Sequence, residues 1–401
     1  MDASQGVFKL IGTVQHYAWG GYNFIPQLLG RSNPDHRPFA EYWLGAHPSR
    51  SSTTEDQFPL SDIINGHPDR YLGSNTSKRF SSLPFLFKVL DVRQMLSIQV
   101  HPSIEGARNG FAEEEQRGIA VTASNRNYKD LNHKPEIMVA LTDFWLLHGF
   151  KVTSHLTQTL DAVPEFRFLK KVFDTKSYRG LYEEVMLMEQ PRVNEILAPL
   201  AARILPAYKE NKLTKDRADF WAAKAVDSFY HDGNFDRGIF SIYFFNLLSI
   251  KKGSGIYQPA GLPHAYLEGQ NIELMANSDN VLRAGLTDKH IDVPELMKHI
   301  VFEPTEPRIL HGKATGSKRI FSGDVEEFEL IQYQTARGGE EKFTSEGPAN
   351  ALLVEGEARL HANGKELPLK QGESVFVAAG TKLDIKARTS LNLFIATVPA
   401  R

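Results

Sequence analysis

The sequence contains no cysteine in its 401 residues. Disulfides and thiolate metal sites are therefore excluded, and a bound metal needs histidine, carboxylate or amide ligands. No stretch approaches the ~20 uninterrupted apolar residues that span a bilayer. The segment Met1–Leu10 also lacks the basic start and apolar run of a secretory signal. These absences predict a cytoplasmic protein with no membrane partner.

An excess of charge of one sign is also absent. The chain carries 46 Lys and Arg against 48 Asp and Glu, a net charge of −2, without a basic or acidic block. Nothing in this balance predicts nucleic acid as a partner, whereas a few clustered cations are enough to bind an anionic small molecule. Apolar residues at 41% and charged residues at 23% are typical of a globular enzyme. The length predicts two or three packed units.

Three regions differ in their patterns. Short β-favouring runs broken by Pro, Gly and Ser fill the first 150 residues, and strands return after Phe240. Between them, about 153 to 232, apolar residues recur at helical spacing. The expected strands include Phe85–Leu90, Leu96–Val100 and Ile137–Leu141; the expected helices include Leu181–Met188, one starting near Pro191, and Asp219–Tyr230 with Trp221, Val226 and Phe229 buried.

The two β-rich regions share a spaced motif. Gly253, Pro259, Gly261 and His264 recur as Gly372, Ala378, Gly380 and Leu383, offset by 119 residues (372 − 253). Such glycines mark tight turns where φ is positive or backbones approach closely. The first copy resembles the second conserved motif of the cupin superfamily. The second copy resembles a cupin that kept its barrel and lost its metal.

Candidate metal ligands occur in three separate segments. In a strand, Ser97, Gln99 and His101 share one face, while Ile98 and Val100 belong to a core. That polar face points either at solvent or at a ligand. Glu136 begins an apolar run, where a buried carboxylate needs a cation, and Lys134 is one alternative to a metal.

His264 adds the third segment, although a histidine beside Ala265 and Tyr266 is also compatible with a satisfied core residue. Two imidazoles, one carboxylate and one amide together suit a divalent ion such as Zn²⁺. With a single anionic ligand the ion keeps a net positive charge and polarises a bound oxygen. After His264, acids and bases are interleaved with apolar residues up to Lys289, and Arg283 in this segment suits an anionic group.

These residues also match a known family. The run Tyr128-Lys129-Asp130-Leu131-Asn132-His133-Lys134-Pro135-Glu136 resembles the type I phosphomannose isomerase pattern Y-x-D-x-N-H-K-P-E at every fixed position. Similar matches are His264-Ala265-Tyr266, Glu273-Leu274-Met275-Ala276, Ser278-Asp279-Asn280, Arg283-Ala284-Gly285, Gln15-His16-Tyr17-Ala18-Trp19-Gly20 and Glu41 to Pro48. The resemblance covers nearly the whole chain. One position departs from the pattern: Asp288 stands where the family usually has proline.

The resemblance implies a zinc-dependent aldose–ketose isomerase that interconverts mannose 6-phosphate and fructose 6-phosphate through a cis-enediol, in the service of GDP-mannose biosynthesis. One Zn²⁺ per chain is expected on Gln99, His101, Glu136 and His264. Arg283 is expected to stabilise the developing oxyanion. Ser97 and Lys88 are expected at the phosphate, with Trp19 and Tyr266 at the sugar. Lys134, His133, Asp279, Lys289 and metal-bound water stay open as carriers of the proton.

The expected architecture is mainly β: two cupin (jelly-roll) β-barrels and one inserted helical domain. Residues 1–152 and 233–312 are expected to form the metal-binding barrel, 153–232 the helical domain, and 313–401 a degenerate barrel. We expect a monomer. Lys88 lies between Phe87 and Val89 and needs an anionic partner if it points inward; otherwise it reaches solvent.

Two other functions are compatible with part of the pattern. A cupin oxygenase also uses His and Glu ligands, but around iron with two open positions. A catalytically inactive sugar-binding cupin would have lost a ligand or Arg283, and neither is lost. The full set of motifs therefore favours the isomerase.

Overall fold

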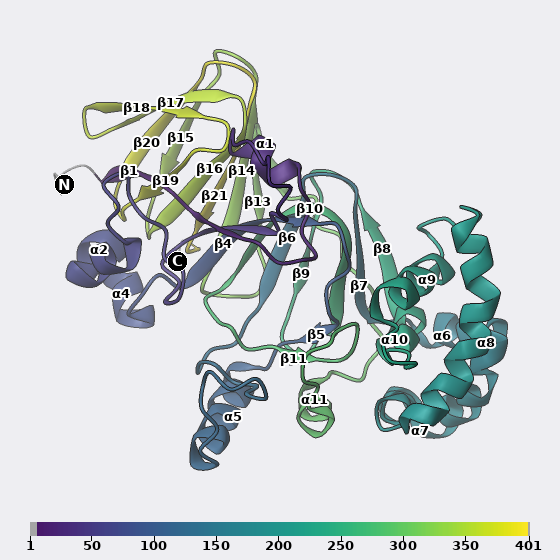
Figure 1. Cartoon of the computed structure of the whole chain (residues 1–401). Coiled ribbons are helices and arrows are strands. Elements are labelled where there is room, and N and C mark those ends of the chain that lie inside the picture. Colours follow the sequence, from purple (N-terminus) through teal and green to yellow (C-terminus); the bar gives the residue numbers. More distant parts are fainter. Residues whose placement is uncertain (1–5, 400–401) are drawn as a thin grey trace.

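The computed structural model describes residues 6–399 and contains helices and strands in comparable amounts, arranged around three sheets (Figure 1). The expectation of a mainly β fold is wrong in its proportion, because five helices interrupt the first β-rich region. They are α1 (Phe24–Leu28), α2 (Leu60–Gly66), α3 (Pro68–Leu72), α4 (Ser74–Phe80) and α5 (Ile104–Gln116). The Pro and Ser that indicated strand breaks also start helices: Pro68 opens α3, and Ser103 caps α5 by accepting from the Gly106 N–H.

The central sheet has ten strands drawn from both sides of the helical region. Its members are β2 (Thr13–Gln15), β3 (Glu41–Leu44), β4 (Phe85–Val92), β5 (Gln99–Val100), β6 (Glu136–Ala140), β7 (Phe144–Phe150), β8 (Phe245–Ile250), β9 (Gly255–Gln258), β10 (His264–Ala276) and β11 (Leu282–Arg283). The 13-residue strand β10 pairs antiparallel with β4, β5, β6 and β7. Segments far apart in the chain are thus joined along one strand. The expected strand Leu96–Val100 is shorter in the structure, limited to Gln99–Val100.

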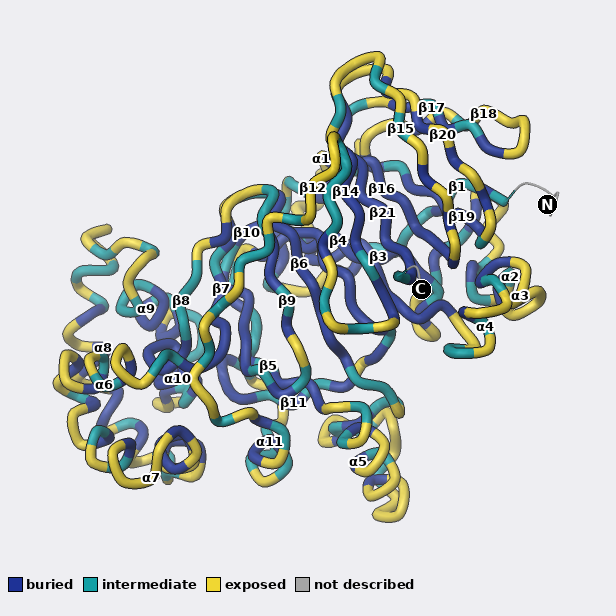
Figure 2. The backbone as a smooth tube through the Cα atoms, turned by 180° about the vertical axis from the view of Figure 1, so that it is seen from behind, coloured by how far each residue is buried: buried dark blue, intermediate teal, exposed yellow. Residues whose placement is uncertain are grey.

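Successive side chains of β4 point alternately into the apolar core and toward the candidate site. Phe85, Phe87 and Val89 pack into an apolar cluster that also contains Leu352 and Phe394 of the C-terminal region. Successive strand residues point to opposite faces, so Lys88 points the other way, into the cavity described below. The core is continuous between the two β regions, as the buried strands of Figure 2 show.

The helical region lies beside the central sheet (Figure 1). It comprises α6 (Thr153–Ala162), the 3₁₀ turn η2 (Pro164–Phe166), α7 (Arg167–Met186), α8 (Gln190–Lys209), α9 (Ala218–Phe229) and α10 (Gly238–Phe244). Pro191 lies in the first turn of α8, and Trp221 and Val226 are buried, as the sequence predicts; Phe229 is partly buried. The apolar faces of these helices join Ile98, Val100 and Leu147 of the central sheet region in one cluster.

The C-terminal region is a second β unit. After α11 (Val293–His299) come β12 (Lys313–Thr315), β13 (Lys318–Phe321), β14 (Glu329–Thr335), β15 (Glu340–Thr344), β16 (Ala349–Glu355), β17 (Glu357–Ala362), β18 (Lys365–Lys370), β19 (Ser374–Val377), β20 (Lys382–Ala387) and β21 (Leu391–Thr397). They form a seven-stranded and a four-stranded sheet with apolar residues between them. The seven-stranded sheet includes β1 (Val7–Leu10), which pairs with β19.

The repeated glycine motif has the same backbone geometry in both copies. Gly253 and Gly372 have φ of 83° and 80°, and each lies two residues before a four-residue strand, β9 or β19. Gly261 and Gly380 follow those strands with φ of 79° and 76°. A side chain at such φ is strained, so glycine is favoured at these turns. The 119-residue offset therefore relates equivalent turns, and Leu383 is buried where the first copy has His264.

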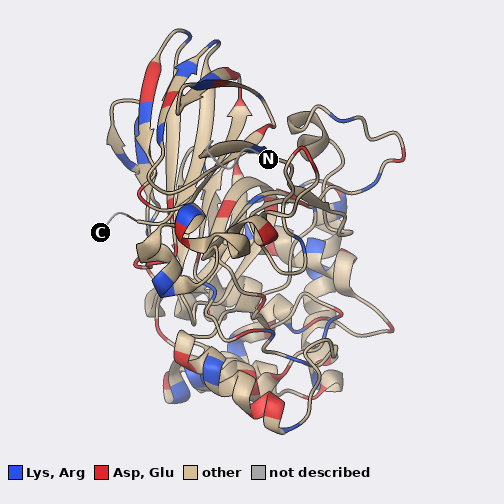
Figure 3. Cartoon of the chain, turned by 90° about the vertical axis from the view of Figure 1, so that its left-hand side faces the viewer, with Lys and Arg blue, Asp and Glu red and all other residues tan. Residues whose placement is uncertain are grey.

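Charges of both signs are interleaved on the side of the molecule shown in Figure 3, in keeping with the near-zero net charge. Within residues 6–399, no helix combines the length and hydropathy needed to cross a membrane.

Candidate metal centre and active site

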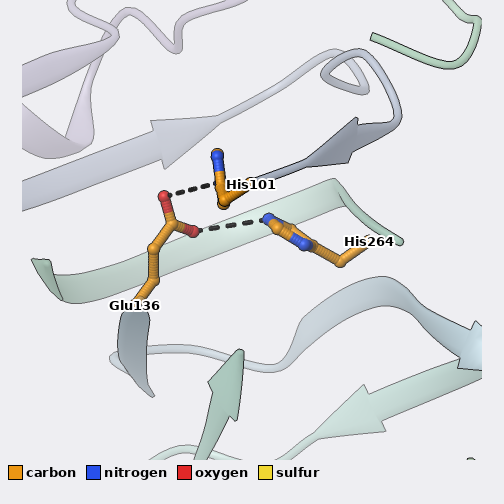
Figure 4. A group of neighbouring side chains, drawn as sticks. All are labelled: His101, Glu136 and His264. Atoms are coloured by element: carbon orange, nitrogen blue, oxygen red, sulfur yellow. Dashed lines mark ion pairs between the residues drawn. The ribbon is translucent and has the colours of Figure 1, made fainter. Parts of the chain in front are cut away.

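Three of the predicted ligands converge in the interior of the central sheet. His101 follows β5, Glu136 opens β6 and His264 opens β10, and all three are buried. The Nε2 atom of His101 lies 3.2 Å from Glu136 Oε1, and that of His264 lies 3.4 Å from Glu136 Oε2 (Figure 4). The sequence predicted this convergence from three separate segments, and the pairing of β10 with β5 and β6 produces it.

Backbone carbonyls fix which nitrogen of each imidazole faces the carboxylate. His101 Nδ1 lies 2.9 Å from the carbonyl oxygen of Asn280, and His264 Nδ1 lies 3.0 Å from that of Leu262. A carbonyl only accepts, so Nδ1 donates and the Nε2 lone pair remains available. Burial lowers the pKa of His101 to about 4, so its ring is neutral at pH 7. Both imidazoles therefore carry the tautomer that a metal ligand needs.

The spacing of these atoms fits a small divalent ion. Tetrahedral bonds of ~2.0–2.1 Å place neighbouring ligand atoms about 3.3–3.4 Å apart, and each Nε2 lies close to this distance, at 3.2 and 3.4 Å, from one of the two carboxylate oxygens. His101 Nε2 is buried with no hydrogen-bond partner among the described residues. A buried polar atom without a partner is costly, and a metal satisfies it. One ligand atom from each of the three residues lies within 4.8 Å of the others.

Glu136 is the anionic member of the group. Burial alone raises the pKa of this carboxyl, but the ammonium of Lys134, with Nζ 3.3 Å from Oε1, is the largest opposing cause, and the pKa lies well below its usual range. Lys134, the sequence-based alternative to a metal, therefore lies beside Glu136 together with the two histidines. The carboxylate stays ionised.

A cavity opens beside the three ligands. Five other residues assigned from the sequence line it together with Glu136 and His264; they are Lys88, Ser97, Gln99, Lys134 and Tyr266. Gln99 is paired in register with His264 on β10 and with Arg283 on β11. The Tyr266 hydroxyl is buried, and its pKa lies well above the usual value. Burial is the largest cause, and the nearby carboxylates of Glu273 and Glu136 add to it.

Besides the ligand His101, five assigned residues lie outside the lining of this cavity. Trp19 stacks on Tyr17 at 5.8 Å between ring centroids, and His133 Nε2 lies 2.7 Å from Glu327 Oε1. Asp279 lies 3.3 Å from His47. Burial lowers the pKa of both Arg283 and Lys289, and the charge of Arg283 lowers the pKa of Lys289 further. Asp288 is exposed and 3.8 Å from His231, so the departure from the family pattern falls on a surface loop.

Lys88 points inward and does not reach solvent. Its Nζ lies 3.1 Å from Glu273 Oε2 and 3.8 Å from Glu41 Oε2, and 5.1 Å from the centroid of the Trp43 ring. Burial lowers the pKa of Lys88, but the two carboxylates outweigh it and raise the pKa above the usual value. The anionic partners that the sequence required are therefore carboxylates of the protein itself.

Sequence reasoning missed four polar residues around the site. Glu41 and Glu273 line the cavity, and burial raises the pKa of Glu273. His47 and Glu327 hold Asp279 and His133. In the sequence, Glu273 is one acid in a segment of mixed charge. Local patterns could not show that it lies opposite Lys88 in the β10–β4 register. Glu327 comes from the C-terminal region, and no local pattern links it to His133.

Comparison with known proteins agrees with this geometry. Residues 7–153 match the family model described as phosphomannose isomerase type I, catalytic domain. The mannose-6-phosphate isomerase of Escherichia coli K12 is 37% identical over 382 residues, which cover 92% of this chain and 94% of that protein. The chain belongs to the type I mannose-6-phosphate isomerase family. It is therefore an isomerase enzyme. The human mannose-6-phosphate isomerase is 32% identical over 430 residues, with 98% of each chain covered.

Solved structures of family members share the fold. A crystal structure of the Salmonella typhimurium mannose 6-phosphate isomerase, bound to its substrate and to zinc, superposes with a TM-score of 0.89 at 34% identity. The match covers 98% of this chain and 100% of that one. The apo form of the same enzyme gives the same TM-score and coverage.

A pH dependence follows from His148, which lies opposite His264 in the β7–β10 register. Burial lowers its pKa to about 4 in the folded protein, against about 6.5 when unfolded. Between these values the unfolded chain binds the extra proton, so stability is full above pH 6.5 and is lost as the pH falls toward 4. The variant His148→Gln keeps a donor to the Tyr257 carbonyl but cannot bind the proton. The loss in free energy of unfolding between pH 6.5 and pH 4 should therefore be smaller by about 3 kcal/mol.

Urea unfolding at a series of pH values measures this difference. The matched control is His155→Gln, an exposed histidine of α6, which should leave the slope unchanged. If the free energy of unfolding changes with pH equally in wild type and His148→Gln, the pKa of His148 is the same in the folded and the unfolded protein.

Proposed function

We propose that this protein interconverts mannose 6-phosphate and fructose 6-phosphate, using one Zn²⁺ per chain. The observation that carries the proposal is the pair of imidazole Nε2 atoms that lie 3.2 and 3.4 Å from the two oxygens of one buried carboxylate, beside a cavity lined by lysines. A family member with the same fold binds its sugar-phosphate substrate and zinc.

His101, Glu136 and His264 would hold the metal, with the amide of Gln99 as the fourth ligand. Gln99 is the neutral oxygen donor of the cavity that lies in register with His264. Zinc supplies a Lewis acid that polarises a sugar oxygen.

The charge balance of the cavity supports this assignment. Three carboxylates, of Glu41, Glu136 and Glu273, face two ammonium groups, of Lys88 and Lys134. Without an ion the lining has one excess negative charge, which repels a phosphorylated sugar. A divalent ion reverses the sign and leaves one excess positive charge, which attracts it.

The sugar phosphate is held by discrete side chains, because the sequence has no glycine-rich phosphate loop. We assign Ser97 and Lys88 to the phosphate, and Tyr266 and Trp19 to the sugar. Lys88 has three N–H donors, so an ammonium shared with Glu273 and Glu41 still has capacity for an anion. Arg283 lies beside Gln99 in the β11–β5 register, where its charge reaches the reacting end of the sugar.

The reaction moves one proton between C2 and C1 of the open-chain sugar through a cis-enediol. Lys134 is the best-placed carrier of the four side chains considered, since His133, Asp279 and Lys289 lie outside the cavity lining. Its Nζ is 3.3 Å from Glu136. Arg283 stabilises the oxyanion that develops as the proton leaves carbon.

The architecture that serves this chemistry is two cupin barrels. We propose residues 1–152 and 233–312 as the metal-binding barrel, 153–232 as the helical domain, and 313–401 as the degenerate barrel. Two elements cross these bounds, since β1 pairs with β19 of the C-terminal sheet and α10 packs with the helical region. The equal backbone geometry of the two glycine motifs supports a common barrel topology. We further propose a cytoplasmic monomer that serves GDP-mannose biosynthesis, on the strength of the family resemblance.

Removal of the metal should abolish the isomerase activity. In a coupled assay with mannose 6-phosphate, a chelator should stop turnover and added Zn²⁺ should restore it. The variant His264→Ala loses a ligand and should bind zinc at least ~10–100-fold more weakly, the range for losses in the shell around a ligand. Elemental analysis measures occupancy, and the exposed His155→Ala is the control. Full zinc occupancy in His264→Ala removes this histidine from the ligand set.

Loss of Arg283 should affect turnover more than binding. If the guanidinium acts on charge that develops during enolisation, Arg283→Ala lowers kcat by ~10²–10³, the range for one preorganised donor, with a smaller change in KM. Steady-state kinetics measures both, and the exposed Arg388→Ala should match the wild type. A large rise in KM with constant kcat assigns Arg283 to the phosphate instead.

Loss of Lys88 should weaken recognition of the phosphate. Lys88→Ala should cost ~1.5–3 kcal/mol of mannose 6-phosphate binding, the range for a hydrogen bond to a charged group. Unphosphorylated mannose should be a far poorer substrate and nearly indifferent to the change. Because Lys88 also neutralises Glu273 and Glu41, near-UV circular dichroism must first show native packing. Equal losses on both sugars make Lys88 a structural residue.

A further inference from the structure

A second cavity lies in the helical region. Its walls come from α6, the segment 212–217 and the first turn of α9, with Lys151 just after β7 and Tyr243 of α10 completing it. Figure 1 shows α6, α9 and α10 gathered on the side of the central sheet. The volume is about 630 Å³, which is enough for a small organic molecule. None of its lining residues belongs to the metal-site cavity.

Lys151 places a cation on this wall that has no carboxylate partner within residues 6–399. Its Nζ donates to Thr159 Oγ1 at 3.1 Å and to the Tyr243 carbonyl at 2.6 Å, two neutral acceptors. Burial is the cause that lowers the pKa of Lys151 to about 8, and no carboxylate opposes it. An ammonium has three N–H donors, so one is left for the cavity. A largely buried ammonium without an anion is unfavourable.

Two more cations line the same cavity. Lys212 and Arg217 are exposed at its edge, and Lys212 is paired with Glu210 at 2.5 Å, which leaves Arg217 as the second cation for a ligand. Arg217 precedes α9, whose first N–H groups receive no side-chain cap among the described residues. The one lining carboxylate, Asp219, is already engaged, since it accepts from Tyr243 Oη at 2.7 Å and from Arg203 at 3.4 Å. The cavity therefore offers cationic groups and N–H donors in excess of its anionic groups. Ala162, Val163 and Leu213 add apolar surface.

A dianionic group matches this arrangement better than a carboxylate. An arginine presents paired donors to phosphate oxygens, and a lysine adds a point charge. We propose that the cavity is a second ligand site, which binds a phosphorylated small molecule with its phosphate between Lys151 and Arg217. The organic part of the ligand lies against the apolar wall. This site is separate from the substrate site and does not rest on the isomerase mechanism.

Acetylation of Lys151 reports occupancy of this site directly. The zinc-loaded enzyme is treated with an amine-acylating reagent, with and without inorganic phosphate or glycerol phosphate, and modification is followed lysine by lysine by mass spectrometry. At a ligand concentration ten times Kd, only the unoccupied fraction reacts, so the rate at Lys151 should fall about tenfold. Lys171, which is exposed on α7, should react at one rate throughout.

Two variants test the same site without the reagent. Lys151→Met and Arg217→Gln should each reduce the stabilisation by glycerol phosphate in thermal unfolding to the part contributed by the substrate site, whereas the control Lys171→Met retains all of it. Both should keep kcat/KM for mannose 6-phosphate within about twofold. Arg217 is exposed, so its variant stays informative if Lys151→Met folds poorly. An unchanged acetylation rate at Lys151 with phosphate, or equal protection by malonate, would overturn the proposal.

Discussion

The site is organised around the buried negative charge of Glu136. A carboxylate at 4% exposure is unfavourable unless a cation lies beside it. This one has the Lys134 ammonium at 3.3 Å, and two imidazole Nε2 atoms within 3.4 Å complete its surroundings. The imidazoles in turn are fixed by carbonyls of Asn280 and Leu262, which lie in loops that the strands hold. Removal of any one of these partners leaves a charge or a lone pair unsatisfied. The rest of the fold supplies the positions of these few atoms.

Strand β10 is the element that makes this possible. Because it pairs with four other strands of the central sheet, it brings His264 beside Gln99 and Glu273 beside Lys88. The helical region is inserted between β7 and β8, which still pair with each other. Its apolar faces cover the outer side of the strands that carry the site. The insertion thus leaves the inward face free for polar side chains.

The C-terminal region contributes to the site as well as to stability. It shares a continuous apolar core with β4 and β10, and its Glu327 holds His133 next to the ligand segment. Burial opposes ionisation of Glu327, but His133 outweighs burial and lowers its pKa. The C-terminal region can therefore orient residues near the metal site of the central sheet. A shared core and this polar contact together join the two β regions.

Local patterns in the sequence indicated the helices of the inserted region, several strands and the types of ligand, but they did not indicate the helices α1 to α5. Pro191 and the apolar spacing after it identified α8, and the absence of cysteine left His, carboxylate and amide as ligands. The motif around Glu136 identified the family. Local patterns could not show that Lys88 is neutralised by Glu41 and Glu273, or that no carboxylate of the described part of the chain lies beside Lys151. Those facts depend on strand register and on helix packing between residues that are distant in the chain. Charge compensation in the interior is therefore decided by the tertiary structure, since it requires atoms within a few ångströms that the chain order does not bring together.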